Sequence, residues 1–192
     1  KSYTEFEIMG STRDDAAGEA FDKAARLLSL PYPGGPNIER LAREGSACIP
    51  FPKMFSGSGY DFSYSGLKTA VINYCHTKDQ KGEAFCAADV AASFQSAACG
   101  VLAERAVRAA KEKGVNTIVA GGGVIANGYL RTLLTEECSR AGIRAVLPEK
   151  KYCTDNAAMI AAEGLVQYLA GNFSDLSLNA AAHIPLGKKG KQ

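Results

Sequence analysis

The chain has 192 residues, of which 46% are hydrophobic and 22% charged, a balance typical of a globular protein with a sizeable core. Its formal net charge of only +2 argues against a strongly basic, polyanion-binding protein. No apolar run is long enough to span a membrane, and residues 1–5 are not followed by the apolar segment of a signal peptide. We therefore expect a protein that makes no membrane contact.

The start of the chain predicts a strand followed by an amphipathic helix. Residues 3–9 alternate apolar and polar side chains, which favours a strand, and we expect its hairpin partner to be missing. The stretch 12–15 resembles a capping box with aspartate in place of glutamate, so we expect a helix over about 13–29. Besides its apolar face, this helix carries an acidic stripe of Asp15, Glu19 and Asp22. A solvated surface accounts for Asp15 better than for Asp22.

Prolines, glycines and alanines organise the middle of the chain. Residues 31–36 contain three prolines and two glycines, which predict a helix stop and a rigid loop. The elements expected after it are a short helix over 36–44, a candidate strand over 60–64, a helix over 66–76 capped by Ser65, and a helical stretch over 83–113. The last of these is rich in alanine and forms either one long helix or two helices that join near Gly100.

The most informative stretch runs from Gly114 to Leu130. Residues 117–120 predict a short buried strand, and three consecutive glycines, 121–123, follow it. Asn127 is a good N-cap for a helix over 128–141. Bare backbone N–H groups beside a helix N-terminus suit a phosphate or a nucleoside. A tight strand-to-helix turn without any ligand would give the same pattern.

After this stretch, strand and helix continue to alternate. Residues 143–147 predict a second strand, and 156–169 predict another helix after a loop at 152–156. Such alternation indicates an α/β core with parallel strands. The sequence pattern fades after Gly171, and we expect a frayed tail.

The six cysteines show no C-x-x-C spacing, and several stand among alanines in helical stretches. We expect reduced thiols that pack as small hydrophobic side chains, and reduced thiols indicate a cytoplasmic protein.

Six short motifs follow one another along the chain: DDAAGEAFDK (14–23), PGGP (33–36), FSYSGLKT (62–69), AASFQ (91–95), AGGGV (120–124) and CTDNAAMI (153–160). In this order they resemble the C-terminal part of the tRNA threonylcarbamoyltransferase family (TsaD, formerly Gcp), which older descriptions call O-sialoglycoprotein endopeptidase. The resemblance extends along nearly the whole chain, to about residue 187.

The resemblance implies an α/β fold of the actin, Hsp70 and sugar-kinase-like ATPase architecture (the ASKHA fold), in which two similar lobes enclose a cleft. The chain would be the second lobe with a helical insertion. We divide it into a remnant strand of the lobe (1–12), a mainly helical insertion with nucleotide-contacting helices (13–113), an α/β core with the glycine-rich nucleotide loop (114–170) and a C-terminal tail (171–192).

The implied activity is that of an acyltransferase in tRNA processing. The family moves threonylcarbamoyl from threonylcarbamoyl-AMP to N6 of the adenosine beside the anticodon of tRNA. In bacteria it works with a smaller paralogous subunit and an ATPase subunit. Two alternatives are a metalloprotease, as the older name suggests, and a non-enzymatic nucleotide-binding module that docks a partner protein.

The resemblance also implies a substrate site for threonylcarbamoyl-AMP or an adenine nucleotide. Its residues are Asp22, Gly35, Glu39, Gly122, Gly123 and Asn127. Paired carboxylates can accept both ribose hydroxyls, and a glycine lets the adenine lie against the backbone. Asn127 could also serve only as an N-cap, or fill both roles. No residue is assigned as the catalytic acid or base.

Asp155 is the implied ligand of one divalent metal, iron or zinc, since a carboxylate is a hard ligand. As it stands just before a predicted helix, it could instead be that helix's N-cap. The family's other metal ligands form a His-x-x-x-His motif on the first lobe. This chain has only His76 and His183, in no such pattern. We expect it to carry half of the active cleft and to be inactive alone.

Overall fold

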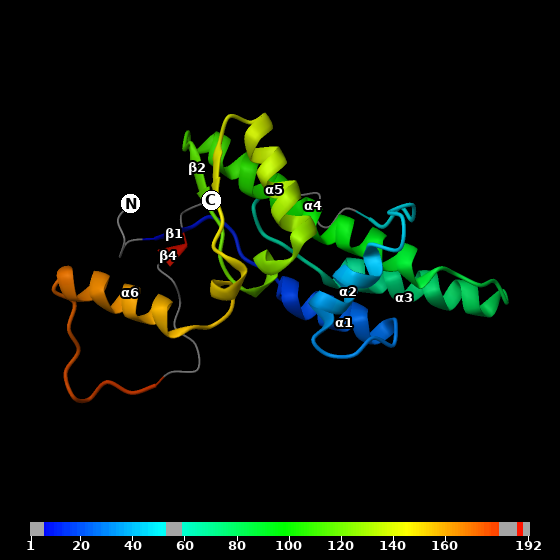
Figure 1. Ribbon diagram of the computed structural model, residues 1–192, viewed down its shortest axis with the longest axis horizontal. Coiled ribbons are helices and arrows are strands. Elements are labelled where there is room, and N and C mark those ends of the chain that lie inside the picture. Colours follow the sequence, from blue (N-terminus) through cyan, green and yellow to red (C-terminus); the bar gives the residue numbers. More distant parts are fainter. Residues whose placement is uncertain (1–5, 53–58, 181–187, 190–192) are drawn as a thin grey trace.

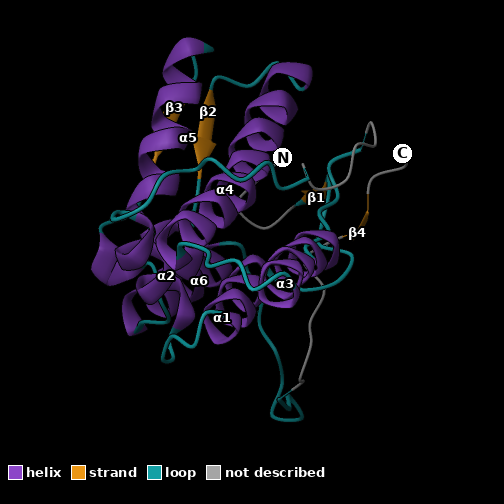
Figure 2. Cartoon of the chain, turned by 90° about the vertical axis from the view of Figure 1, so that its right-hand side faces the viewer, coloured by secondary structure: helices purple, strands orange, loops and turns teal. Residues whose placement is uncertain are grey.

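A computed structural model describes residues 6–52, 59–180 and 188–189 of the chain (Figures 1 and 2). In chain order the elements are β1 (Glu7–Ile8), α1 (Ala17–Leu27), α2 (Gly34–Ala42), α3 (Ser65–Gln80), α4 (Ala87–Glu112), β2 (Thr117–Val119), the 3₁₀ turn η1 (Gly123–Ala126), α5 (Gly128–Arg140), β3 (Arg144–Val146), the 3₁₀ turn η2 (Lys150–Tyr152), α6 (Ala157–Leu169) and β4 (Lys188–Lys189). Within the described residues, no helix is long and apolar enough to cross a membrane.

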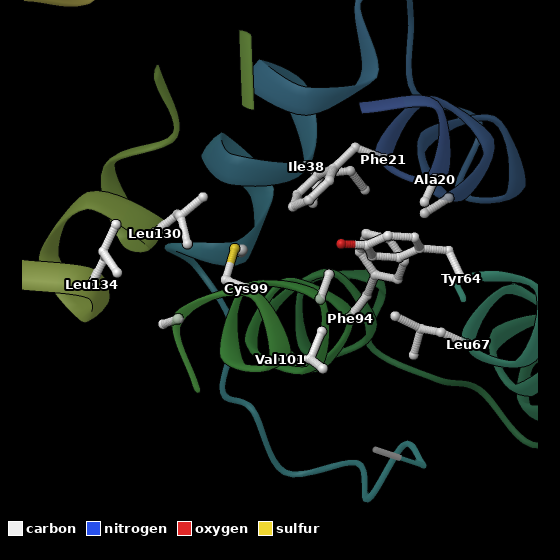
Figure 3. Close-up of a cluster of buried hydrophobic side chains, with 14 of the residues drawn as sticks. Ala20, Phe21, Ile38, Tyr64, Leu67, Phe94, Cys99, Val101, Leu130 and Leu134 are labelled. Atoms are coloured by element: carbon white, nitrogen blue, oxygen red, sulfur yellow. The ribbon is translucent and has the colours of Figure 1, made fainter. Parts of the chain in front are cut away.

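Helix α4 is the element around which the other helices of the core pack. Its 26 residues include many alanines and no proline, and at 1.5 Å per residue they span about 39 Å. Gly100 does not interrupt it, so the predicted helical stretch is a single helix. Helices α1, α2, α3 and α5 all contact it, and Figure 3 shows their side chains meeting those of α4. The rings of Phe21 and Phe94 form an edge-to-face pair at 5.1 Å near the centre of this core.

The strands form two small parallel pairs. β2 pairs with β3 in the register Thr117–Arg144, and α5 connects them, which confirms the predicted α/β alternation. β1 pairs with β4 near the other end of the chain. The frayed-tail prediction is therefore wrong for residues 188–189, which form β4. Residues 181–187 and 190–192 lie outside the described residues.

Helix α1 begins at Ala17, so the predicted start near residue 13 is wrong. The side chains of the supposed capping box make other bonds. Thr12 Oγ1 donates to the carbonyl of Asp15 at 2.6 Å. Asp14 Oδ1 accepts from the backbone N–H of Tyr64 at 2.7 Å, and Asp14 Oδ2 accepts from that of Ser65. Asp14 thus caps the start of α3 instead of its own helix.

Two further predictions about strands are wrong. Residues 60–64 do not form a strand, because only a single bridge joins Phe62 to Thr12. Residues 117–119 do form β2, but the strand is not buried: Thr117 is exposed, and the side chain of Val119 is 76% exposed. Among the described residues, β2 has a partner strand on one edge alone.

All six cysteines are free, as predicted. Cys99, Cys138 and Cys153 are buried, whereas Cys48 and Cys86 are exposed. Burial raises the pKa of the Cys99 thiol to about 12, which keeps it protonated and unreactive within the core.

Candidate functional site

Five of the six residues predicted to bind substrate line one cavity of about 320 Å³, which we call the first cavity. They come from three separate elements: α1, α2 and the turn between β2 and α5. Its lining consists of Gly18, Phe21, Asp22, Gly35, Pro36, Glu39, Gly123, Val124, Ala126 and Asn127. The sixth predicted residue, Gly122, lies in the adjoining pocket described below.

Asp22 joins α1 to α2. Its Oδ1 accepts from the backbone N–H of Gly34 at 2.6 Å, so it caps α2, for which the N-cap residue Pro33 has no side-chain donor or acceptor. The helices lie so close here that a Cβ on Gly34 would be 2.5 Å from the Cα of Asp22. Asp22 is therefore not merely a solvated acid of the helix surface. Among the described residues its second oxygen, Oδ2, accepts no hydrogen bond, which leaves it able to bind a ligand.

Glu39 places a second carboxylate at the first cavity. Its side chain is 14% exposed and forms an ion pair with Arg43 at 2.6 Å, one turn along α2. Its Oε1 also lies against the start of α5, where a Cβ on Gly128 would come within 2.9 Å of it. A carboxylate at a helix N-terminus is stabilised by the partial positive charge there. The glycine at position 128 makes this approach possible.

Asn127 has the predicted N-cap role. Its Oδ1 accepts from the backbone N–H of Leu130 at 2.9 Å, and the residue lines the first cavity, so the cap and a ligand contact are compatible. Its Nδ2 donates to Oε1 of Gln95 on α4 at 2.8 Å. No role is predicted for Gln95 from the sequence. The available signal was an amide side chain within the largely apolar, alanine-rich stretch of α4.

The remaining wall of the first cavity is apolar. Phe21 is 2% exposed and is supported from behind by Phe94, and Pro36 and Val124 complete the surface. A small apolar cavity with a few convergent polar groups is typical of a site for a small molecule. Here two carboxylates and one amide stand at the polar side, which suits a flat base that carries a sugar with hydroxyl groups.

A second pocket, of about 680 Å³, adjoins the first cavity at Gly123, which lines both. It lies at the carboxyl ends of the parallel strands β2 and β3, where open α/β sheets commonly bind ligands. Gly121, Gly122 and Gly123 form one side, and residues 153–155 another. Gly122 has φ of +90°, a conformation that favours glycine.

Asp155 lies in this second pocket and is exposed. The N-cap of α6 is Asn156, whose Oδ1 accepts from the backbone N–H of Met159 at 3.0 Å, so the alternative that Asp155 caps this helix is wrong. Within the part of the chain that the structure describes, no three His, Cys, Asp or Glu side chains gather in a metal-binding group. Asp155 can thus supply one ligand of a metal, but the described residues do not form a complete metal site.

Arg131, on the first turn of α5, links the loops around the second pocket. Its Nη1 donates to the carbonyl of Ile125 at 3.2 Å and lies 3.9 Å from Sγ of Cys153. Cys153 is 3% exposed, as expected for a packed thiol. No role is predicted for Arg131 from the sequence.

A larger cavity, of about 790 Å³, runs along α4 between residues 47–51 and α5. None of the predicted site residues lines it. The candidate site is therefore the first cavity together with the second pocket.

Comparison with known proteins identifies related sequences. The family model described as tRNA N6-adenosine threonylcarbamoyltransferase (TsaD) matches residues 1–162. A protein of that name from Clostridium botulinum is 47% identical over 191 residues, which make up 98% of this chain and 56% of that protein. One from Moorella thermoacetica is 50% identical over 188 residues, 97% of this chain and 55% of that protein. The chain thus spans about half the length of these curated relatives.

Among solved structures, HypF of T. kodakarensis resembles the chain with a TM-score of 0.62 at 21% identity, over 83% of this chain and 21% of that one. Full-length HypF in a phosphate- and nucleotide-bound form gives a TM-score of 0.59 at 20% identity, over 82% of this chain and 21% of that one. At such low identity the likeness shows a shared mixed α/β fold. The assignment to an ASKHA lobe remains a prediction.

Proposed function

The chain belongs to the tRNA N6-adenosine threonylcarbamoyltransferase family, and from this membership we propose that it supplies the nucleotide-binding half of the active cleft of a threonylcarbamoyl transferase. In the proposed reaction, N6 of a tRNA adenosine attacks the carbamoyl carbon of threonylcarbamoyl-AMP. The bond between that carbon and the phosphate oxygen breaks, AMP leaves with the bonding electrons, and N6 loses one proton. Because AMP is the released product, it is also the simplest probe of the site.

In this proposal the adenosine part of the donor occupies the first cavity. Phe21, Pro36 and Val124 provide an apolar surface for the base, and Gly35 leaves the backbone open to it. Oδ2 of Asp22 and the carboxylate of Glu39 accept the ribose hydroxyls. The observation that carries the proposal is the convergence of residues from α1, α2 and the β2–α5 turn on one cavity of nucleoside-compatible character.

The phosphate and the threonylcarbamoyl group would then extend over Gly122 and Gly123 into the second pocket. Asp155 would be one ligand of a divalent metal there, with the other ligands contributed from outside this chain. When bound, such a metal supplies electrophilic polarisation of the reacting group. The metal-binding role of Asp155 rests on the family resemblance and on the hard-ligand chemistry of its exposed carboxylate, and iron and zinc are the two candidates.

The proposed partners are tRNA, as the relatives' name states of them, a smaller paralogous subunit and an ATPase subunit, all in the cytoplasm. The full-length protein, incubated with threonylcarbamoyl-AMP, unmodified tRNA and these subunits, should yield threonylcarbamoyladenosine that mass spectrometry detects in the digested tRNA. Persistent absence of the product would contradict the transferase proposal and favour a nucleotide-binding module without enzymatic activity.

The protease alternative finds no support in the described part of the chain. Catalytic zinc sites of proteases use three protein ligands, typically including a His-Glu-x-x-His helix. No such helix and no group of three suitable side chains is present among the described residues.

A further inference from the structure

We propose that Gln95 is a positioning residue of the first cavity: it fixes the amide of Asn127 so that one N–H of that amide remains for a ligand. The inference rests on the proposed nucleotide site and names a part of it that the family assignment does not specify. Gln95 lies on α4 and does not line the first cavity itself. It therefore acts through Asn127.

The hydrogen bonds fix the orientation of both amides without ambiguity. The backbone N–H of Leu130 can only donate, so the atom of Asn127 that faces it must be the oxygen, Oδ1. Nδ2 of Asn127 then faces Gln95, which must present its own oxygen, Oε1, to accept the bond of 2.8 Å. A flipped Asn127 would place two donors against each other at the start of α5.

Because both side chains are buried, a change in the hydrogen bonding between Gln95 and Asn127 would be costly. Gln95 is 5% exposed and Asn127 is 8% exposed, so water has little access to replace a lost partner. Among the described residues, the second N–H of Asn127 Nδ2 donates to no protein atom. It is a neutral side-chain donor of a residue that lines the first cavity, beside the acceptors of Asp22 and Glu39, and it suits a hydrogen-bond acceptor on the ligand.

Residues 94 and 95 thus support opposite sides of the same cavity from one turn of α4. Phe94 packs edge-to-face on Phe21, which forms the apolar wall. Gln95 bonds Asn127, which belongs to the polar side. This geometry gives a structural reason for the buried amide of Gln95 on α4.

The test is a double-mutant cycle in the full-length protein, with AMP affinity measured by calorimetric titration. Gln95→Met keeps a side chain of similar length but removes the acceptor, and it should weaken AMP binding about fivefold, the effect of one neutral hydrogen bond. In an Asn127→Ala background the same change should alter affinity by less than about twofold, because Gln95 would then have nothing to position. Ser96→Ala, on the same helix, is the matched control and should bind like wild type.

Equal AMP affinity of Gln95→Met and wild type would overturn the inference. So would an equal loss in both backgrounds, which would mean that Gln95 acts on the fold and not through Asn127. A second measurement keeps the test independent of ligand. Hydrogen exchange of the Asn127 side-chain amide, followed by NMR, should be slow in wild type and fast in Gln95→Met. If wild type fails to bind AMP, the proposed function fails, and unchanged exchange in Gln95→Met would separately overturn the role of Gln95.

Discussion

The first cavity and the second pocket are neighbours that share Gly123, yet they are built in different ways. The first lies among packed helices, and each of its three polar side chains is held by a bond to another element or another turn. The second lies at the exposed ends of two short strands, and its one carboxylate, Asp155, makes no hydrogen bond or ion pair among the described residues. This chain thus holds the nucleotide half of the proposed site in place, whereas it supplies only one predicted ligand, Asp155, to the metal half.

Helix α6, which follows Asp155, differs from α4 in the same way, because its side chains are not packed against a core. It has no buried residue, and its large apolar side chains, such as Ile160 and Leu169, are 66% and 74% exposed. Figure 1 shows it set apart from α1–α4. A helix of 13 residues that buries nothing gains little stability from packing.

The largest expected effect comes from breaking the support of the first cavity. Phe94→Ala should lower the free energy of unfolding by about 3–5 kcal/mol, because it leaves a void against Phe21 in the centre of the core. Thermal and urea denaturation would measure it. Ile160→Ala in α6 is the control and should change stability by less than about 0.5 kcal/mol. Equal losses of stability in the two variants would contradict the claim that packing stabilises the first cavity more than it stabilises α6.

Asp22→Ala should have the next largest effect, in two separate measurements. Loss of the cap on Gly34 should cost about 1 kcal/mol of stability. Loss of a charge-assisted bond to the ribose should cost roughly 1.5–3 kcal/mol of AMP affinity, measured by calorimetric titration. Asp22→Asn separates the roles, since its amide oxygen can still cap α2 without the charge. Unchanged AMP affinity in Asp22→Ala would show that Asp22 caps α2 and does not bind the ligand.

Acid should loosen the attachment of residues 11–15 to α3. Burial acts to raise the pKa of Asp14, but hydrogen bonds from Ser63, Tyr64, Ser65 and Asp15 outweigh it and lower the pKa to about 2 from an ordinary value of 3.8. The stability that ionised Asp14 contributes is therefore present above pH 3.8 and is lost as pH falls toward 2.

In Asp14→Asn this acid-dependent loss should be smaller, because the variant cannot titrate at position 14. Urea denaturation at a series of pH values would compare the two proteins. Identical pH dependence would show that other groups dominate acid sensitivity in this range.

Asp155→Asn should have the smallest effect on stability and the most selective effect on function. Because Asn156, not Asp155, caps α6, unfolding of the metal-free protein should change by less than about 0.5 kcal/mol. Asp155→Ala should be equally benign for stability. In the full-length protein both changes should reduce metal content and threonylcarbamoyl transfer together, as measured by elemental analysis and the transfer assay.

Full metal occupancy and full transfer in Asp155→Asn would show that Asp155 is no ligand. The isolated chain, dialysed, should hold no stoichiometric metal, because Asp155 is the only metal ligand predicted within it. Tightly bound iron or zinc in the isolated chain would contradict the view that the metal half is incomplete.

The elements that the sequence predicted well are those governed by local chemistry. The alanine-rich composition predicts α4, and Asn127 before a helical run predicts the cap of α5. The predictions fail where contacts between residues that are far apart in the sequence determine the local structure. Thr12 and Asp14 have the residue types of a helix cap, but Asp14 bonds residues about 50 positions away. The cap that Asp22 provides to α2 and the bond of Gln95 to Asn127 likewise depend on the packing of separate helices, which spacing within one helix does not reveal.

The most direct test of the account is an NMR titration of the 192-residue chain with AMP. An organised nucleotide site predicts saturable shifts of backbone amides around the first cavity, at Gly35, Gly123 and Asn127, without matching shifts along the larger cavity of α4. Asp22→Ala should reduce these shifts at every AMP concentration below saturation. Absence of saturable shifts, or shifts centred on the larger cavity, would contradict the claim that this chain carries an organised nucleotide site.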